Sequence, residues 1–221
     1  MVENIRDDII KASGPLQTCS GLKAGIEASI HAMKSVFEEE MTEVILLVDA
    51  DNAFNNLNRK AALHNIRHLC PTFYRYLHNT YQMPARMIVN GQNEQDYIKS
   101  EEGSTQGDVP AMQMYATGTR PLVDGLGEVV DPQFCKQVWY ADDSAAAGKT
   151  MEVKKWWDKL NTEGPKYGYY PKPSKTVLIV KNLEMVEHAR EIFGGTGVEI
   201  ALEGERHLGA VIGKTEFKEN M

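Results

Sequence analysis

The sequence contains few cysteines, no long apolar run and no excess of positive charge. Its three cysteines, Cys19, Cys70 and Cys135, are widely spaced and odd in number, which excludes a disulfide framework. The expected compartment is therefore reducing and intracellular, either nuclear or cytoplasmic. The longest apolar run, residues 44–48, is much shorter than the roughly 20 residues that span a membrane, so no membrane contact is expected. The first residues show no basic region followed by an apolar stretch, so the protein is not expected to be secreted.

The charge balance bears on the class of partner. The formal net charge is −7, whereas proteins that bind nucleic acid usually carry a basic surface. The rest of the composition, with 42% hydrophobic and 25% charged residues over 221 positions, is that of a folded soluble protein with one good core. An acidic chain can still serve a nucleic-acid enzyme if its carboxylates gather to bind metal ions and other domains supply the basic surfaces.

The pattern of apolar residues predicts an α+β domain with a mainly antiparallel sheet packed against helices. Steps of three and four residues predict a helix over residues 20–40, and residues 43–48 have the composition of a buried strand. Asn90-Gly91 predicts the turn of a β-hairpin between residues 86 and 98. Leu22, Ile26, Ile30, Met33 and Phe37 form the expected apolar face of the first helix. Further helices are expected over residues 58–70, 73–81, 111–126, 151–167 and 183–193, and strands over residues 135–140, 145–147, 176–181, 198–202 and 207–212.

Aspartates follow two of the predicted strands. Asp49 comes directly after the strand over residues 43–48, and Asp142-Asp143 form a tight turn after the strand over residues 135–140. If the two strands are neighbours, these acids converge, and like charges about 4 Å apart repel by roughly 4 kcal/mol at an effective dielectric constant near 20. A hard divalent cation such as Mg²⁺, which prefers oxygen ligands, removes this repulsion.

An ordinary polar turn is the alternative explanation for the aspartate pair. The apolar residues Val138, Trp139 and Tyr140 precede the pair and place it at the mouth of a core. Paired carboxylates that hold two metal ions about 3.5–4 Å apart can stabilise both the attacking and the leaving oxygen in phosphoryl transfer. Asp51 lies beyond the strand and is interpreted as a solvated or helix-start acid.

Five segments in order resemble the motifs of the reverse transcriptase family, most closely those of the domain carried by non-LTR retrotransposons. A sixth segment, residues 14–28, resembles the approach to the first motif in that family. The order and spacing of the segments are more specific than any one of them alone. The five segments are LVDADNAFN at residues 47–55, EGSTQGD at 102–108, YADD at 140–143, PSKT at 173–176 and HLG at 207–209.

The resemblance implies that residues 1–221 form a single domain, a polymerase palm with partial fingers and no thumb. This chain is then expected to be a fragment of a longer retroelement polyprotein. The implied activity is RNA-directed DNA polymerase, with an RNA template, a DNA primer, dNTPs and the remaining domains of a retroelement protein as partners. The implied cofactor is Mg²⁺, with Mn²⁺ as a substitute. The implied metal ligands and catalytic acids are Asp49, Asp142 and Asp143. The other implied roles are proton donation by Lys175, nucleotide binding by Ala50, Phe54, Gln106 and Gly107, and a primer grip at His207, Leu208 and Gly209.

Other functions remain open. No basic fingers are recognisable upstream of Gly14 and no thumb follows Ile212, which favours a chain that is inactive alone, or a catalytically silent palm remnant that binds nucleic acid or a protein partner. A nucleotide cyclase shares paired carboxylates but gives no account of Gln106-Gly107 or Lys175.

Two further pairs of residues, the histidines 64 and 68 and the tryptophans 156 and 157, have simple structural explanations. His64 and His68 have a spacing that suits zinc on one helical face, but the other ligands are missing and a solvated helix face is expected. Trp156-Trp157 could stack on bases, but we expect one of these side chains to pack in the core and the other to be partly exposed.

Overall fold

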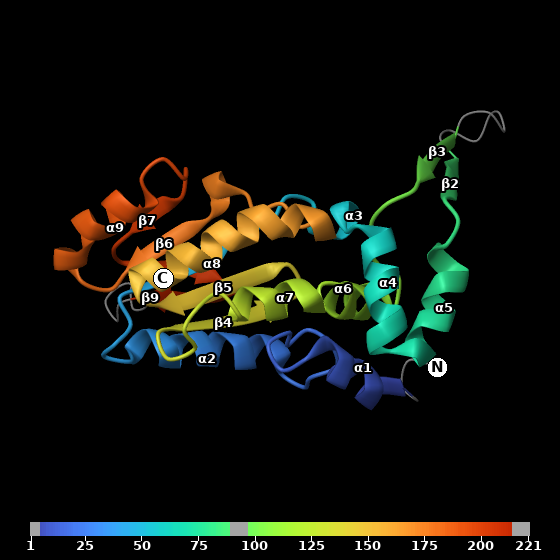
Figure 1. Ribbon diagram of the computed structural model, residues 1–221, viewed down its shortest axis with the longest axis horizontal. Coiled ribbons are helices and arrows are strands. Elements are labelled where there is room, and N and C mark those ends of the chain that lie inside the picture. Colours follow the sequence, from blue (N-terminus) through green and yellow to red (C-terminus); the bar gives the residue numbers. More distant parts are fainter. Residues whose placement is uncertain (1–4, 89–96, 214–221) are drawn as a thin grey trace.

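A five-stranded sheet forms the centre of the computed structural model, which describes residues 5–88 and 97–213 (Figure 1). The strand order is β4-β5-β1-β6-β7. Strand β1 is antiparallel to both β5 and β6, as expected, whereas β6 and β7 run parallel to each other. The strands are β1 (Val44–Val48), β4 (Cys135–Tyr140), β5 (Asp143–Gly148), β6 (Val177–Val180) and β7 (Glu199–Ala201).

Helices cover the sheet unequally. Every residue of β1 is buried, but its side chains alternate between two separate cores. Val44, Leu46 and Val48 belong to the larger core, which includes α8, whereas Ile45 and Leu47 belong to a smaller core with α2 and β9. The helices are α1 (Arg6–Ser13), α2 (Gly25–Glu38), α3 (Ala53–Asn56), α4 (Arg59–Leu69), α5 (Pro71–Tyr81), α6 (Ala111–Gly118), α7 (Arg120–Gly127), α8 (Thr150–Glu163) and α9 (Val186–Phe193), with short 3₁₀ turns at Gly164–Tyr167, Pro173–Lys175 and Leu183–Met185.

A buried polar network joins the sheet to α8. The indole N–H groups of Trp139 and Trp156 both donate to the Gln137 side-chain oxygen at 2.9 Å, and the Gln137 amide donates to the Val123 carbonyl at 2.9 Å. Trp157 is also buried, so the expectation that one tryptophan of the pair is partly exposed was wrong. Both rings pack in the core and neither is available for base stacking.

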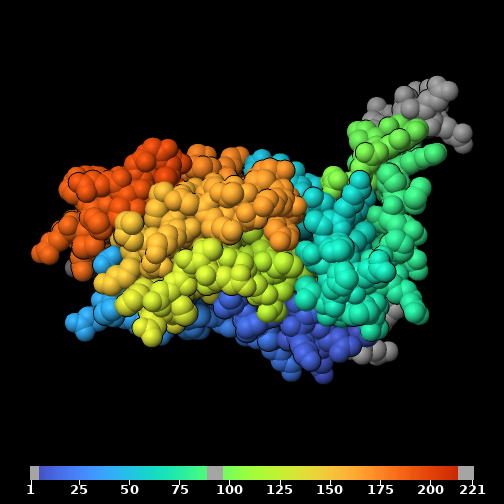
Figure 2. All heavy atoms as spheres, viewed as in Figure 1, coloured from blue at the N-terminus to red at the C-terminus, as the bar shows by residue number. Residues whose placement is uncertain are grey.

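Two hairpins lie outside the main sheet. Strands β2 (Ala85–Ile88) and β3 (Tyr97–Ser100) pair antiparallel and project from the α4–α5 end of the molecule (Figures 1 and 2). The predicted Asn90-Gly91 turn lies outside the described residues. Strands β8 (Gly204–His207) and β9 (Ala210–Gly213) form the second hairpin, whose turn is Leu208-Gly209. Among the described residues, no helix is long and apolar enough to cross a membrane.

Several predicted boundaries were wrong. The helix expected over residues 20–40 begins only at Gly25, which lies close against the Thr18 carbonyl oxygen, and both Leu22 and Ile26 are exposed. The helix expected over residues 111–126 is divided at Thr119 into α6 and α7. The helix α1, near the N-terminus, was not predicted.

Candidate active site

The turn between β4 and β5 presents two of the aspartates. Tyr140 pairs with Asp143 across the hairpin, so Ala141 and Asp142 form its loop. Ala141 has a φ of +55°, in the left-handed region that favours glycine. The buried Gln17 side chain holds this residue: its amide N–H donates to the Ala141 carbonyl at 3.1 Å, and its carbonyl oxygen accepts the Ala141 N–H at 2.8 Å. Gln17 therefore satisfies both backbone groups of a strained residue beside the acids.

A second set of contacts supports the turn from the other side. The hydroxyl of the fully buried Tyr169 donates to the Asp142 carbonyl at 2.8 Å and lies 3.0 Å from the Ser144 hydroxyl. The Thr18 N–H donates to the Trp139 carbonyl at 2.8 Å. The sequence did not place Gln17, Ser144 or Tyr169 at the aspartate turn: Tyr169 was expected in an aromatic cluster that closes the sheet. A buried glutamine is a signal of polar partners, but the sequence does not identify them.

Asp49 and Asp143 lie at the same edge of the sheet. Val48 pairs with Ser144, so Asp49 follows β1 at the point where Asp143 begins the antiparallel β5. By strand alternation both side chains share the face of Ile45, the face of the smaller core. The neighbouring strands that the sequence argument required are therefore present, and they bring together acids that are far apart in the chain.

The electrostatics of the turn reflect this convergence. Burial, followed by the charges of Asp142 and Asp49, raises the pKa of Asp143 to about 6. Burial raises the pKa of Asp142 as well, and the charge of Asp49 adds to this effect. Lys175 Nζ lies 3.0 Å from the Asp49 carboxylate, and Lys172 Nζ lies 3.0 Å from Asp51. Asp51 is thus an exposed, ion-paired acid, as the sequence suggested.

The donor chemistry of this edge fits Mg²⁺. Asp49, Asp142 and Asp143 offer only carboxylate oxygens, the ligand type that this ion prefers. Among the described residues, no three His, Cys, Asp or Glu side chains are already grouped as a metal cage. Mg²⁺ in nucleotide-processing enzymes is commonly held by one or two carboxylates together with waters and substrate phosphates, so a complete cage is not required.

The residues expected to contact the nucleotide lie on segments that pack together. Phe54 stacks on the buried Tyr115, with ring centroids 4.8 Å apart and an interplanar angle of 26°. The Ser104 N–H donates to the Phe54 carbonyl at 2.8 Å, which ties the loop of Gln106 and Gly107 to α3. Both of these loop residues are exposed, and a side chain at Gly107 would meet open space.

Ala50 and a buried arginine complete the surroundings. Ala50 is buried and forms an isolated antiparallel bridge with Pro171. The Arg59 guanidinium donates to the backbone carbonyls of Ser100, Glu102 and Gly103, at distances of 2.8–3.0 Å, and so anchors the start of the same loop.

The β8–β9 hairpin faces the acids across a cleft. The cleft has a volume of about 220 Å³ and is lined by Asp49, Asp143 and Lys175 together with His207 and Leu208 of the hairpin, whereas Asp142 does not line it. Leu208 and Gly209 have φ values of +51° and +80°, as a tight two-residue turn requires. The hairpin expected to grip the primer therefore lies beside the aspartate edge.

His207 predicts a specific pH dependence of stability. Burial lowers its pKa to about 4, and its Nε2 atom has no hydrogen-bond partner among the described residues. The unfolded chain binds a proton near pH 6.5 and the folded protein only near pH 4, so the stability associated with neutral His207 is lost as the pH falls through this window. We expect the His207→Gln variant to lose less stability than the parent between pH 7 and pH 4, by up to about 3 kcal/mol.

Chemical denaturation of the two proteins at several pH values measures this difference. Both proteins contain the same acidic residues, so the difference between the two profiles reports on His207. Parallel pH profiles would show that His207 is not held neutral.

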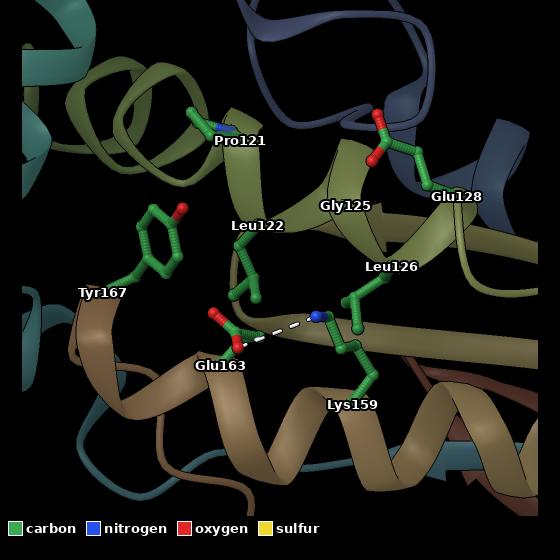
Figure 3. Close-up of a pocket in the computed structure, with 8 residues that line it drawn as sticks. All are labelled: Pro121, Leu122, Gly125, Leu126, Glu128, Lys159, Glu163 and Tyr167. Atoms are coloured by element: carbon green, nitrogen blue, oxygen red, sulfur yellow. Dashed lines mark ion pairs between the residues drawn. The ribbon is translucent and has the colours of Figure 1, made fainter.

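Two other pockets are not lined by Asp49, Asp142 or Asp143. One, of about 180 Å³, lies between α7 and α8 and is lined by Leu122, Leu126 and Tyr167, with the Lys159–Glu163 ion pair of 3.7 Å at its rim (Figure 3). Another, of about 500 Å³, lies among α1, α5 and α7. His64 and His68 contact each other edge to face at 4.8 Å, and no metal-binding group is formed around them in the part of the chain that the structure describes.

No protein-family profile and no curated protein sequence matches the chain. Its fold matches solved structures of telomerase. The structure of telomerase from Candida albicans in complex with a TWJ fragment of telomeric RNA gives a TM-score of 0.65 at 11% identity, over 98% of this chain and 36% of that chain. Apo telomerase from Candida tropicalis gives a TM-score of 0.63 at 11% identity, over 96% of this chain and 38% of that chain. The chain therefore shares the fold of the matched part of these telomerase chains.

This likeness establishes the fold class that the sequence predicted, an α+β palm-like sheet packed against helices. The chain spans little more than a third of the length of the telomerase chains: 36% of the Candida albicans chain and 38% of the Candida tropicalis chain. The non-LTR retrotransposon type and the roles of the site residues stay predictions.

Proposed function

We propose that this chain is the catalytic palm of an RNA-directed DNA polymerase of the non-LTR retrotransposon type. It transfers deoxynucleotides to a primer 3′-hydroxyl on an RNA template. The observation that carries the proposal is the single cleft in which Asp49, Asp143 and Lys175 face the β8–β9 hairpin. The fold shared with telomerase supports it, and so does the order of the five sequence motifs.

The cleft residues Asp49, Asp143, Lys175, His207 and Leu208, together with residues near the cleft, each have a role in this reaction. Asp49, Asp142 and Asp143 would hold Mg²⁺, with Mn²⁺ as a substitute, and such ions would neutralise phosphate charge and favour the ionised primer hydroxyl. Lys175, whose Nζ lies beside Asp49, donates a proton to the leaving pyrophosphate. A further set of residues positions the substrates: Ala50, Phe54, Gln106 and Gly107 for the nucleotide, and His207, Leu208 and Gly209 for the primer.

Phe54 is suited to select the sugar. Its ring is stacked on Tyr115, which is fully buried and cannot shift easily in a close-packed interior. A ring held in this way would exclude a 2′-hydroxyl by contact and so favour deoxynucleotides.

A second candidate function is that of a silent palm that only binds nucleic acid or a protein partner. The observation in its favour is that the chain matches little more than a third of the telomerase chains, so parts that complete an active polymerase are not represented in the match. This candidate predicts binding without product, whatever metal is supplied.

Primer extension separates the two functions. With an RNA template, a DNA primer and dNTPs, we expect the purified chain to extend the primer in Mg²⁺, to stop in EDTA and to resume when Mg²⁺ or Mn²⁺ is added back. Metal dependence follows because the like charges of the acids cannot by themselves bind the triphosphate. Intact, folded protein that gives no product with either metal, although it binds the primer–template, would support the silent palm.

A further inference from the structure

The β2–β3 hairpin, here called the arm (residues 85–88 and 97–100), lacks the packing that usually stabilises such a unit. Its strands form a two-stranded sheet of their own, and all four residues of β2 are exposed. Figures 1 and 2 show it standing away from the body beyond α5. An isolated two-stranded hairpin is marginally stable in water and gains stability from a further strand or a covering surface. The arm is therefore a place where a partner would add stability.

The two faces of the arm differ in chemistry. Arg86 is paired with Lys99 and Ile88 with Tyr97, so these side chains share one face. The Arg86 guanidinium lies over the Tyr97 ring, 5.0 Å from its centroid, which confirms the shared face. The opposite face carries the next cross-strand pair, two exposed apolar side chains: Met87, 51% exposed, and Ile98, 57% exposed.

The basic face is unfavourable without an anion. Like charges directly opposite each other on antiparallel strands destabilise the pair, and Arg86 and Lys99 occupy such positions. A phosphate between them would turn this repulsion into two attractive contacts, and the planar guanidinium suits phosphate oxygens well. Arg86 covers one face of the neighbouring Tyr97 ring, so an unpaired base would stack on the other face of this ring.

The charge of the surrounding lobe points in the same direction. Residues 58–100, which include α4, α5 and the arm, contain six Lys and Arg against two Asp and Glu. The whole chain, in contrast, contains 24 Lys and Arg against 31 Asp and Glu. The basic excess lies in α4 and α5, because Glu94 and Asp96 lie between the two strands of the arm in the sequence and balance Arg86 and Lys99 over residues 85–100. The arm is therefore attached to a basic lobe, and the negative charge resides in the remainder of the chain. The acidic net charge is therefore no obstacle to nucleic-acid binding at this end of the molecule.

We propose that the arm binds single-stranded nucleic acid through the face of Arg86, Lys99 and Tyr97. Arg86 and Lys99 contact phosphates, and Tyr97 stacks on a base. This proposal extends the nucleic-acid binding in the proposed function to a surface outside the catalytic cleft. It requires neither metal ions nor catalysis, so it can be tested independently of both.

Fluorescence anisotropy with a labelled single-stranded RNA of about 16 nucleotides, in EDTA and over a range of salt concentrations, provides the test. Each phosphate contact of a single strand contributes about 0.7 to the slope of log affinity against log salt concentration. We expect Arg86→Gln/Lys99→Gln to lower the slope by about 1.4 and to weaken binding at low salt. Thermal unfolding of Lys99→Gln alone should occur at the same temperature as in the parent or higher, because the cross-strand repulsion is removed.

Two matched variants make the result specific. Met87→Ser/Ile98→Ser alters two exposed side chains on the opposite face of the same arm and should leave the slope unchanged. Lys154→Gln/Lys155→Gln removes the same charge from α8, where both lysines are ion-paired, and should change the slope much less. An unchanged slope in the arm variant, or an equal loss in either control, would overturn the proposal. Loss of RNA binding only in Met87→Ser/Ile98→Ser would place the RNA on the opposite face and would also overturn the proposal. If the chain binds RNA in this way but extends no primer, the result would support the arm proposal and overturn only the catalytic function.

Discussion

Replacing Asp142 by asparagine is expected to slow primer extension at least about a hundredfold without unfolding the protein. The amide side chain would keep the shape of the carboxylate, and the backbone carbonyl that accepts the Tyr169 hydroxyl at 2.8 Å would be unaffected. The carboxylate proposed to bind metal is lost, however, and removing one group that stabilises transition-state charge typically lowers the rate by about a hundredfold to a thousandfold. We expect a loss at least at the lower end of this range, measured as the initial rate of primer extension in Mg²⁺.

Stability should move in the opposite direction. The pKa of Asp142 is raised in the folded protein, chiefly by burial and also by the charge of Asp49. A raised pKa means that the ionised carboxylate disfavours the folded state at neutral pH, and this cost diminishes only as the pH falls through the folded pKa. The neutral amide avoids it, so the melting temperature of the metal-free variant should equal or exceed that of the parent protein.

Asp51→Asn is the matched control for this experiment. Asp51 lies in the same motif as Asp49 but is exposed and paired with Lys172. Its substitution should leave the extension rate close to that of the parent. An exposed ion pair contributes little to stability, and among the described residues no contact of the Asp142-Asp143 turn involves the Asp51 side chain. Equal losses in the two variants, or no loss in Asp142→Asn, would remove the carboxylate turn from the proposed mechanism.

The sequence predicted those parts of the site that depend on strand ends. Asp49 and Asp143 each adjoin an apolar strand, and pairing of these strands is enough to bring the acids to one edge. The same local logic predicted the α+β class, which the fold confirms. The parallel pairing of β6 and β7 could not be predicted, because a short apolar strand carries no signal of its direction.

The contacts that orient the acids were beyond the reach of sequence patterns. Gln17 lies 124 positions from Ala141, and Tyr169 lies 27 positions from Asp142, so no periodicity links them. Periodicity also gave a wrong helix start. The helical pattern of apolar residues includes Leu22, but the helix begins only at Gly25, which packs closely against the Thr18 carbonyl oxygen. In both cases tertiary contacts decide the local structure.

Gln17 supplies the second prediction with a large effect. Gln17→Met keeps the approximate volume of the side chain but removes both hydrogen bonds to Ala141. The buried N–H and C=O of Ala141 then lack partners, and each such group costs about 1–3 kcal/mol. We expect the free energy of unfolding to fall by about 2–5 kcal/mol, measured by chemical denaturation.

A positional effect should accompany the loss of stability. The φ of +55° at Ala141 is held by the Gln17 contacts, and a residue released from the left-handed region relaxes toward more common backbone angles. The carboxylates of Asp142 and Asp143 would then leave the edge that they share with Asp49. In hydrogen-exchange measurements on the metal-free protein, the Ala141 amide should exchange faster than in the parent. Primer extension should also be slower, even far below the melting temperature, where nearly all of the variant is folded.

Thr18→Val separates this effect from general weakening. The Thr18 hydroxyl donates to the Trp139 carbonyl at 3.0 Å and lies 2.6 Å from the Ser29 hydroxyl, so its removal also costs buried hydrogen bonds in the same segment. It leaves the contacts of Ala141 in place, because both of these hydrogen bonds come from the Gln17 side chain. Thr18→Val should therefore lose stability while the exchange rate of the Ala141 amide and the activity per folded molecule stay near those of the parent. If both variants changed these two quantities equally, Gln17 would be a stabilising residue without a specific part in placing the aspartates.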